Sequence, residues 1–79
     1  MGGYPQAEHV FTRNQILMRL AERVRARKQI ARAEADRLRV LSERRDIRGT
    51  TEELLLVTND ARAEAFNEVL QIIEEERKK

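Results

Sequence analysis

The hydrophobic positions of this chain recur at intervals of three, four and seven residues, a spacing typical of α-helices rather than strands. Thr12 and Gln15 fit a capping box, and Phe11 and Ile16 fit a hydrophobic staple, so we predict that a first helix begins here and runs over about 13–46. Its apolar stripe is predicted to consist of Leu17, Leu20, Ala21, Val24, Ala31, Ala35 and Leu38.

A second helix is predicted over about 51–77, after a turn at 47–50. Gly49 is expected to adopt the left-handed conformation that ends the first helix. Thr50 and Glu53 fit another capping box at the start of the second. The apolar face of this helix is expected to hold Leu54, Leu55, Val57, Ala61, Ala65, Phe66, Val69, Ile72 and Ile73.

Two long helices joined by a short turn predict an all-α, antiparallel hairpin. Folding at the turn would pair residues whose numbers sum to about 96–98, with Ala35 opposite Ala61 and Ala31 opposite Ala65. Charge favours the same register. Residues 13–48 carry a net charge of +7 and residues 52–79 a net charge of −4. The expected ion pairs are Arg37–Asp60, Arg32–Glu64, Arg27–Glu68 and Arg23–Glu75.

The length and composition of the chain predict that this hairpin needs a partner. The chain has 79 residues, which is enough for one domain. We expect that domain to span 12–79, after a flexible arm at 1–11. A chain this short buries too little surface to be very stable alone. It has no cysteine and one histidine, so disulfides and zinc are not expected to stabilise it, and no cofactor is predicted. Oligomerisation remains, most simply as a homodimer forming a four-helix bundle with coiled-coil-like packing.

A second apolar row on the first helix is the candidate seam for that association. It consists of Ala26, Ile30, Ala33 and Val40, three of which keep the seven-residue interval. The row could pack against a second copy or against a helix of another protein. The alternative is a scatter of small surface residues, which is common on helices.

The arginines of the first helix are the candidate anion-binding residues. Arg25, Arg32 and Arg39 are spaced by seven, and Tyr4 of the arm could stack on a nucleotide or small anion. Asp36 and the other acidic side chains nearby favour the alternative of a solvated, internally paired face.

An enzymatic function has little support from the residue inventory, because no pair of a nucleophile and a base can be assembled from one histidine and one serine. The segment Leu20-Ala21-Glu22-Arg23 resembles the first long helix of the all-α chorismate mutases, and the resemblance implies a substrate-carboxylate role for Arg23. The chain departs from that family at Glu34, where a lysine is expected, and it has no room for a third helix.

The expected function is therefore that of a small, non-enzymatic protein-binding module, of the kind found among prokaryotic and phage regulators and adaptors. Nucleic-acid or anionic-ligand binding is the second expectation, and a chorismate-mutase-like enzyme a distant third. No apolar run approaches the roughly 20 residues needed to cross a bilayer, so a cytoplasmic location is expected.

Overall fold

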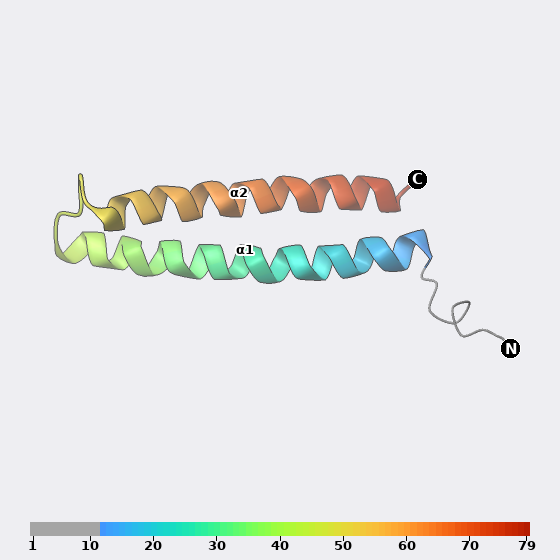
Figure 1. Cartoon of the computed structure of the whole chain (residues 1–79), viewed down its shortest axis with the longest axis horizontal. Helices are drawn as coiled ribbons and strands as arrows, with labels where there is room; N and C mark the ends of the chain where they lie inside the picture. The colour runs from blue at the N-terminus through green and yellow to red at the C-terminus, as the bar shows by residue number, and fades with distance from the viewer. Residues whose placement is uncertain (1–11) are drawn as a thin grey trace, which may run out of the picture.

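Two antiparallel helices make up the described part of the chain. The computed structural model describes residues 12–79, in which α1 (Arg13–Arg44) and α2 (Thr51–Arg77) pack side by side along their length (Figure 1). The all-α hairpin predicted from the hydrophobic spacing is confirmed. The predicted flexible arm, residues 1–11, lies outside the described residues.

The start of α1 has the predicted capping box. The amide of Gln15 donates to Thr12 Oγ1 at 3.2 Å, and the amide of Thr12 donates to Gln15 Oε1 at 2.8 Å. At the start of α2 the amide of Glu53 donates to Thr50 Oγ1 at 3.4 Å. The Glu53 carboxylate accepts a hydrogen bond from Gly49 rather than from Thr50, so only half of the second predicted box is present.

The loop between the helices begins earlier than the predicted turn. α1 ends at Arg44, and its C-cap residue Arg45 is extended. Gly49 has the expected positive φ, +75°, but it lies inside the loop rather than at the end of the helix. Ile47 is the buried residue of this loop, and the amide of Thr50 donates to its carbonyl at 3.1 Å. The loop therefore buries an isoleucine side chain at this end of the hairpin.

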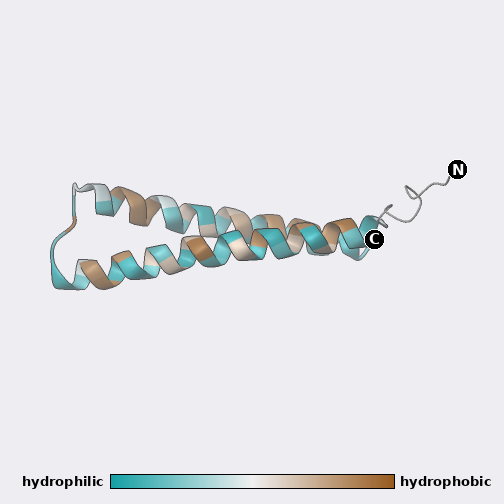
Figure 2. Cartoon of the chain, turned by 60° about the horizontal axis from the view of Figure 1, so that its bottom comes forward, coloured by the Kyte–Doolittle hydropathy of each residue, from teal (hydrophilic) through white to brown (hydrophobic). Residues whose placement is uncertain are grey.

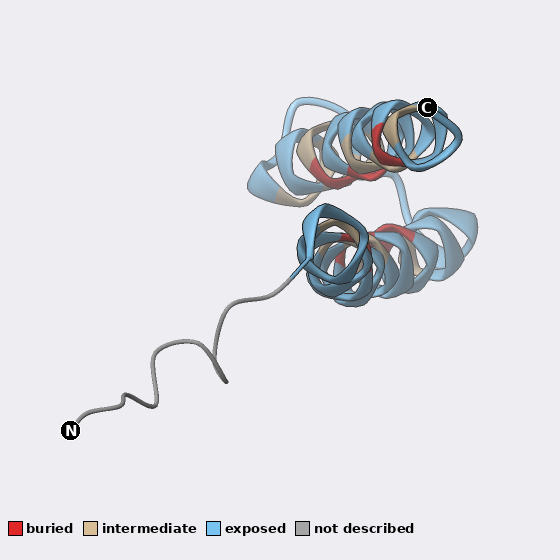
Figure 3. Cartoon of the chain, turned by 90° about the vertical axis from the view of Figure 1, so that its right-hand side faces the viewer, coloured by how far each residue is buried: buried red, intermediate tan, exposed pale blue. Residues whose placement is uncertain are grey.

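The core between the helices is thin and rich in alanine. Among the described residues, seven hydrophobic residues are buried, and four of them are alanines. Leu38 is the large side chain that is completely buried. The buried residues lie on the sides of the helices that face each other, while most of the remaining helix surface is exposed (Figure 3). The seven residues are Ala21, Ala31, Ala35, Leu38, Ile47, Ala63 and Ile73.

The predicted buried face of α2 is partly wrong. Ile73 is buried and Phe66 is half-buried, as expected, but Ala61 and Ala65 are exposed, so the pairing of each with an alanine of α1 does not occur. Ala63 takes their place in the interface. The cause is an apolar arc on α2 that is too wide for one neighbouring helix to cover, so five predicted core residues remain exposed: Leu54, Leu55, Val57, Val69 and Ile72.

Polar contacts between the helices set the register. Lys28 Nζ donates to Asn67 Oδ1 at 3.1 Å, and the Arg45 guanidinium pairs with Glu52 at 2.8 Å. The residue numbers of these pairs sum to 95 and 97, close to the predicted register. At the open end of the hairpin, the Arg13 guanidinium donates to the carbonyl of Glu76 at 2.9 Å.

The individual ion pairs differ from those predicted. Arg39, rather than Arg37, pairs with Asp60, and Arg37 pairs instead with Glu34 on its own helix. Within residues 12–79 none of the four predicted pairs forms. The prediction that basic side chains of the first helix meet acidic ones of the second is nevertheless confirmed by the Arg39–Asp60 and Arg13–Glu76 pairs.

Candidate interaction surfaces

Large hydrophobic side chains are exposed on both helices of the hairpin. Hydrophobic segments recur all along the two ribbons and are not confined to their facing sides (Figure 2). Exposed apolar groups gathered in one area of a surface mark an interaction site, whereas single ones are ordinary. The exposed residues are Ile16, Met18, Leu20, Ile30 and Val40 of α1 and Leu54, Leu55, Val57, Val69 and Ile72 of α2.

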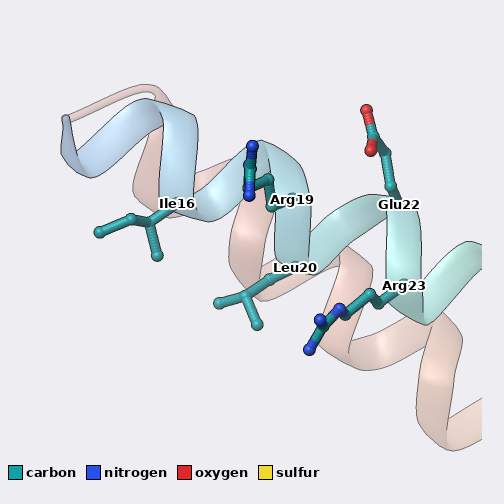
Figure 4. A pocket seen from close by; sticks show the side chains of 5 residues that line it. All are labelled: Ile16, Arg19, Leu20, Glu22 and Arg23. Atoms are coloured by element: carbon teal, nitrogen blue, oxygen red, sulfur yellow. The ribbon is translucent and has the colours of Figure 1, made fainter. Parts of the chain in front are cut away.

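One long side of α1 carries three of these residues, together with two arginines. Ile16, Leu20 and Arg23 line a shallow pocket and point to the same side of the helix, while Glu22 points away (Figure 4). Arg27 and Ile30 follow at the spacing of three and four residues that keeps side chains on one side of a helix. Ile30 is the most exposed of them, at 71%. In this row two arginines, Arg23 and Arg27, separate the apolar residues Ile16 and Leu20 from Ile30.

The same side of the hairpin continues onto α2. Arg27, Ile30 and Ala31 of α1 line a groove together with Asn59, Arg62 and Phe66 of α2, which shows that the two rows share one edge. We call this surface the open face. It comprises Ile16, Leu20, Arg23, Arg27, Ile30 and Glu34 of α1 with Leu55, Asn59, Arg62, Phe66, Val69 and Ile72 of α2. The residues outside the two pockets are placed there by their helical spacing.

The opposite edge of the hairpin is bridged by polar side chains. It holds the Lys28–Asn67 hydrogen bond and the Arg39–Asp60 ion pair, and a hollow there is lined by Arg32, Asp36 and Glu64 among others. We call it the closed edge.

The candidate anion-binding arginines lie toward the closed edge, but they differ in whether they form ion pairs within the hairpin. Arg25 and Arg32 are exposed and line a hollow with Lys28 and Leu70. Arg39 pairs with both Asp60 and Asp36, and the Asp60 carboxylate raises the pKa of its guanidinium. Arg39 is therefore engaged in ion pairs within the hairpin, as the alternative of an internally paired face expects. Tyr4 lies outside the described residues.

The candidate seam of α1 is exposed along its whole length. Ala26, Ile30, Ala33 and Val40 are all accessible, and none is buried against α2. Ile30 lies at the border and also belongs to the open face. The other three continue around the helix, away from α2, and we call them the outer row.

Charge is divided unequally between the two helices. α1 contains ten basic and four acidic side chains, net +6, whereas α2 contains two basic and eight acidic ones, net −6. Several carboxylates are held by nearby donors. A hydrogen bond from Arg37 lowers the pKa of Glu34, and the side chain and backbone amide of Arg48 lower that of Asp46. Asp46 is exposed and Glu34 is still reached by solvent, so their individual effects on stability are small.

Other kinds of site have little support on the described part of the chain. Within residues 12–79 no group of three or more histidine, cysteine, aspartate or glutamate side chains is arranged to hold a metal ion. Neither of the two described helices has a stretch long and apolar enough to pass through a bilayer. Arg23, which the chorismate mutase resemblance singled out, is exposed beside Leu20 rather than enclosed in a cavity.

Comparison with known proteins adds no family: no protein-family model matches this chain, and neither the curated proteins nor the solved structures contain a match.

Proposed function

We propose that this chain is a non-enzymatic protein-binding module that associates with a second copy of itself and presents a helix face to another protein, as an adaptor or regulator. The observation that supports the proposal most strongly is that the hairpin buries few large hydrophobic side chains and exposes many. Leu38 is the one large side chain fully enclosed within residues 12–79, while ten large hydrophobic residues are exposed. Full burial of such a side chain stabilises by about 1.5–3 kcal/mol, so covering several of them outweighs the contribution of an alanine core.

The two surfaces support two roles. The open face is the larger and draws on both helices, so it suits the contact that completes the core. The outer row of Ala26, Ala33 and Val40 lies away from that face and would stay accessible in a dimer. Small residues at seven-residue spacing allow another helix to approach closely. The outer row is therefore the proposed site for a helix of another protein.

Self-association is tested by thermal unfolding at several protein concentrations, followed by circular dichroism at 222 nm. Binding to the folded form raises its apparent stability by mass action, so a dimer unfolds at a higher temperature as concentration rises. The proposal expects an increase of several degrees across a hundredfold range. A melting temperature independent of concentration would contradict it.

Partner binding is tested by a photo-crosslinking amino acid placed at Val40, in the cells that make the protein. A crosslinked product heavier than the homodimer is expected, and it should be lost when Ala33 is replaced by arginine. The matched control places the crosslinker at Arg25, toward the closed edge. Crosslinking from the two positions to the same extent would argue against a specific site on the outer row.

Anion binding through α1 is the second candidate function, favoured by the hollow of Arg25, Lys28 and Arg32. Its signature is salt dependence, because neutralising phosphates releases counterions. Affinity for a single-stranded or duplex oligonucleotide should then fall steeply between about 50 and 200 mM salt. Binding through an apolar helix face would change little over that range.

A further inference from the structure

We infer that a second copy of the chain covers the open face in one particular arrangement: a twofold axis parallel to the helices, both loops at the same end, and α1 of each copy lying against α2 of the other. This inference rests on the proposed self-association and specifies its geometry. Its most diagnostic contact is an ion pair between Glu34 of one copy and Arg62 of the other.

The charges of the helices decide between the two ways of stacking two open faces. An axis perpendicular to the helices would place α1 against α1 and α2 against α2. It would therefore bring two helices of net charge +6 together, and two of net charge −6. An axis parallel to the helices places each basic helix beside two acidic ones. Complementary charge selects orientation and register even where single surface pairs contribute little.

The open face is self-complementary at its centre in this arrangement. Arg62 lines the groove beside Asn59 and Phe66, and it makes no ion pair within residues 12–79. Glu34, half-buried, lies one turn beyond Ile30 on the same side of α1. It accepts hydrogen bonds from Arg37, at 3.1 Å from Nε, and a carboxylate can accept from a second guanidinium as well.

The register of the hairpin places Glu34 of one copy and Arg62 of the other at the same level along the helix axes. Rotation about an axis parallel to the helices does not move a residue along that axis. Cross-copy pairs therefore keep the register of the internal pairs around these residues, whose numbers sum to 95 for Lys28–Asn67, 99 for Arg39–Asp60 and 97 for Arg45–Glu52. Glu34 and Arg62 sum to 96, and each occurs twice in the dimer.

Apolar contacts follow from the same register. Leu41 and Leu55 also sum to 96, so the half-buried Leu41 of one copy meets the exposed Leu55 of the other. Ile30 and Phe66 sum to 96 as well, so Ile30 of one copy lies level with Phe66 of the other, and Leu20 lies about one helical turn from Ile72 of the other copy. The Glu34–Arg62 layer thus lies between two apolar layers.

The experiment exchanges charges between copies. Glu34→Arg should place an arginine against Arg62 of the second copy, and Arg62→Glu should place a glutamate against its Glu34, so each variant alone should dimerise on the order of tenfold more weakly. Mixing the two variants restores both ion pairs, but only in the heterodimer. Native mass spectrometry of the equimolar mixture should therefore show a heterodimer fraction well above the statistical half.

Controls separate this arrangement from the wider proposal. The pair Arg25→Glu and Glu43→Arg makes the same charge changes away from the open face, and its mixture should give the statistical fraction. The chain carrying both Glu34→Arg and Arg62→Glu should regain the homodimer, which excludes misfolding as the cause of the single effects.

Each remaining outcome has one meaning. Dimers that persist while the mixed variants pair at the statistical fraction would overturn the proposed arrangement and leave self-association standing. A wild-type chain that forms no dimer at any concentration would overturn both.

Discussion

Truncating Leu20 is expected to weaken the dimer on the order of 30-fold, while truncating Met18 leaves it nearly unchanged. The two side chains are matched. They are two residues apart on α1, similar in size and helix propensity, and 45% and 48% exposed in the hairpin. Two residues correspond to a rotation of about 200°, so they point to opposite sides of the helix. Leu20 belongs to the open face and Met18 does not.

The magnitude follows from the exposed fraction of Leu20. Full burial of leucine contributes about 1.5–3 kcal/mol, and the 45% that the hairpin leaves exposed therefore represents about 1 kcal/mol available to a second copy. A twofold dimer contains this contact twice, giving about 2 kcal/mol, or roughly 30-fold in the dissociation constant.

Sedimentation equilibrium of Leu20→Ala and Met18→Ala, each against the wild type, measures this difference. The losses of packing within the hairpin are similar for the two variants, so they cancel in the comparison. Equal dissociation constants for the two variants, or a larger effect at Met18, would refute the assignment of the open face as the dimer interface.

Three further outcomes are expected. Thr12→Ala should cost about 1 kcal/mol by removing the N-cap of α1, seen as a lower melting temperature that Thr12→Ser recovers. Ile47→Ala should lower the free energy of unfolding by about 2–4 kcal/mol, because it leaves a cavity under the loop. Faster hydrogen exchange of the backbone amides near the loop would detect this loss. Stability should fall modestly as the pH drops below about 4, because Glu34, Asp46 and Glu52 have lowered pKa values and bind fewer protons folded than unfolded. Glu34→Gln should flatten that dependence, and 1 M salt should too.

The starts and the class of both helices could be predicted because local chemistry determines them. The reciprocal hydrogen bonds of Thr12 and Gln15 require three residues of spacing and nothing from the rest of the chain. The same holds for the Thr50 hydroxyl at the start of α2. The end of α1 was predicted less well, because Gly49 marks where the chain needs a left-handed residue and not where the helical hydrogen bonds stop.

The buried side of α2 could not be predicted from its own sequence. Hydrophobic residues cover a wide arc of this helix, so several rotations about its axis bury similar amounts of apolar surface. The structure selects the row through Asn59, Ala63 and Ile73, where small side chains let α1 approach closely. A polar residue such as Asn59 gave no sign of a buried position, yet its Nδ2 is satisfied locally by the carbonyl of Leu55, at 2.9 Å. The open face became recognisable only once that rotation was fixed.

The mass of the assembled protein tests the central claim most directly. Native mass spectrometry of the gently purified protein should give a species of about 18.6 kDa, twice the 9.3 kDa chain. Sedimentation at micromolar concentration should give the same mass. A compact, fully helical species of 9.3 kDa at the same concentrations would mean that the hairpin is complete by itself and that the open face has no second copy to bind.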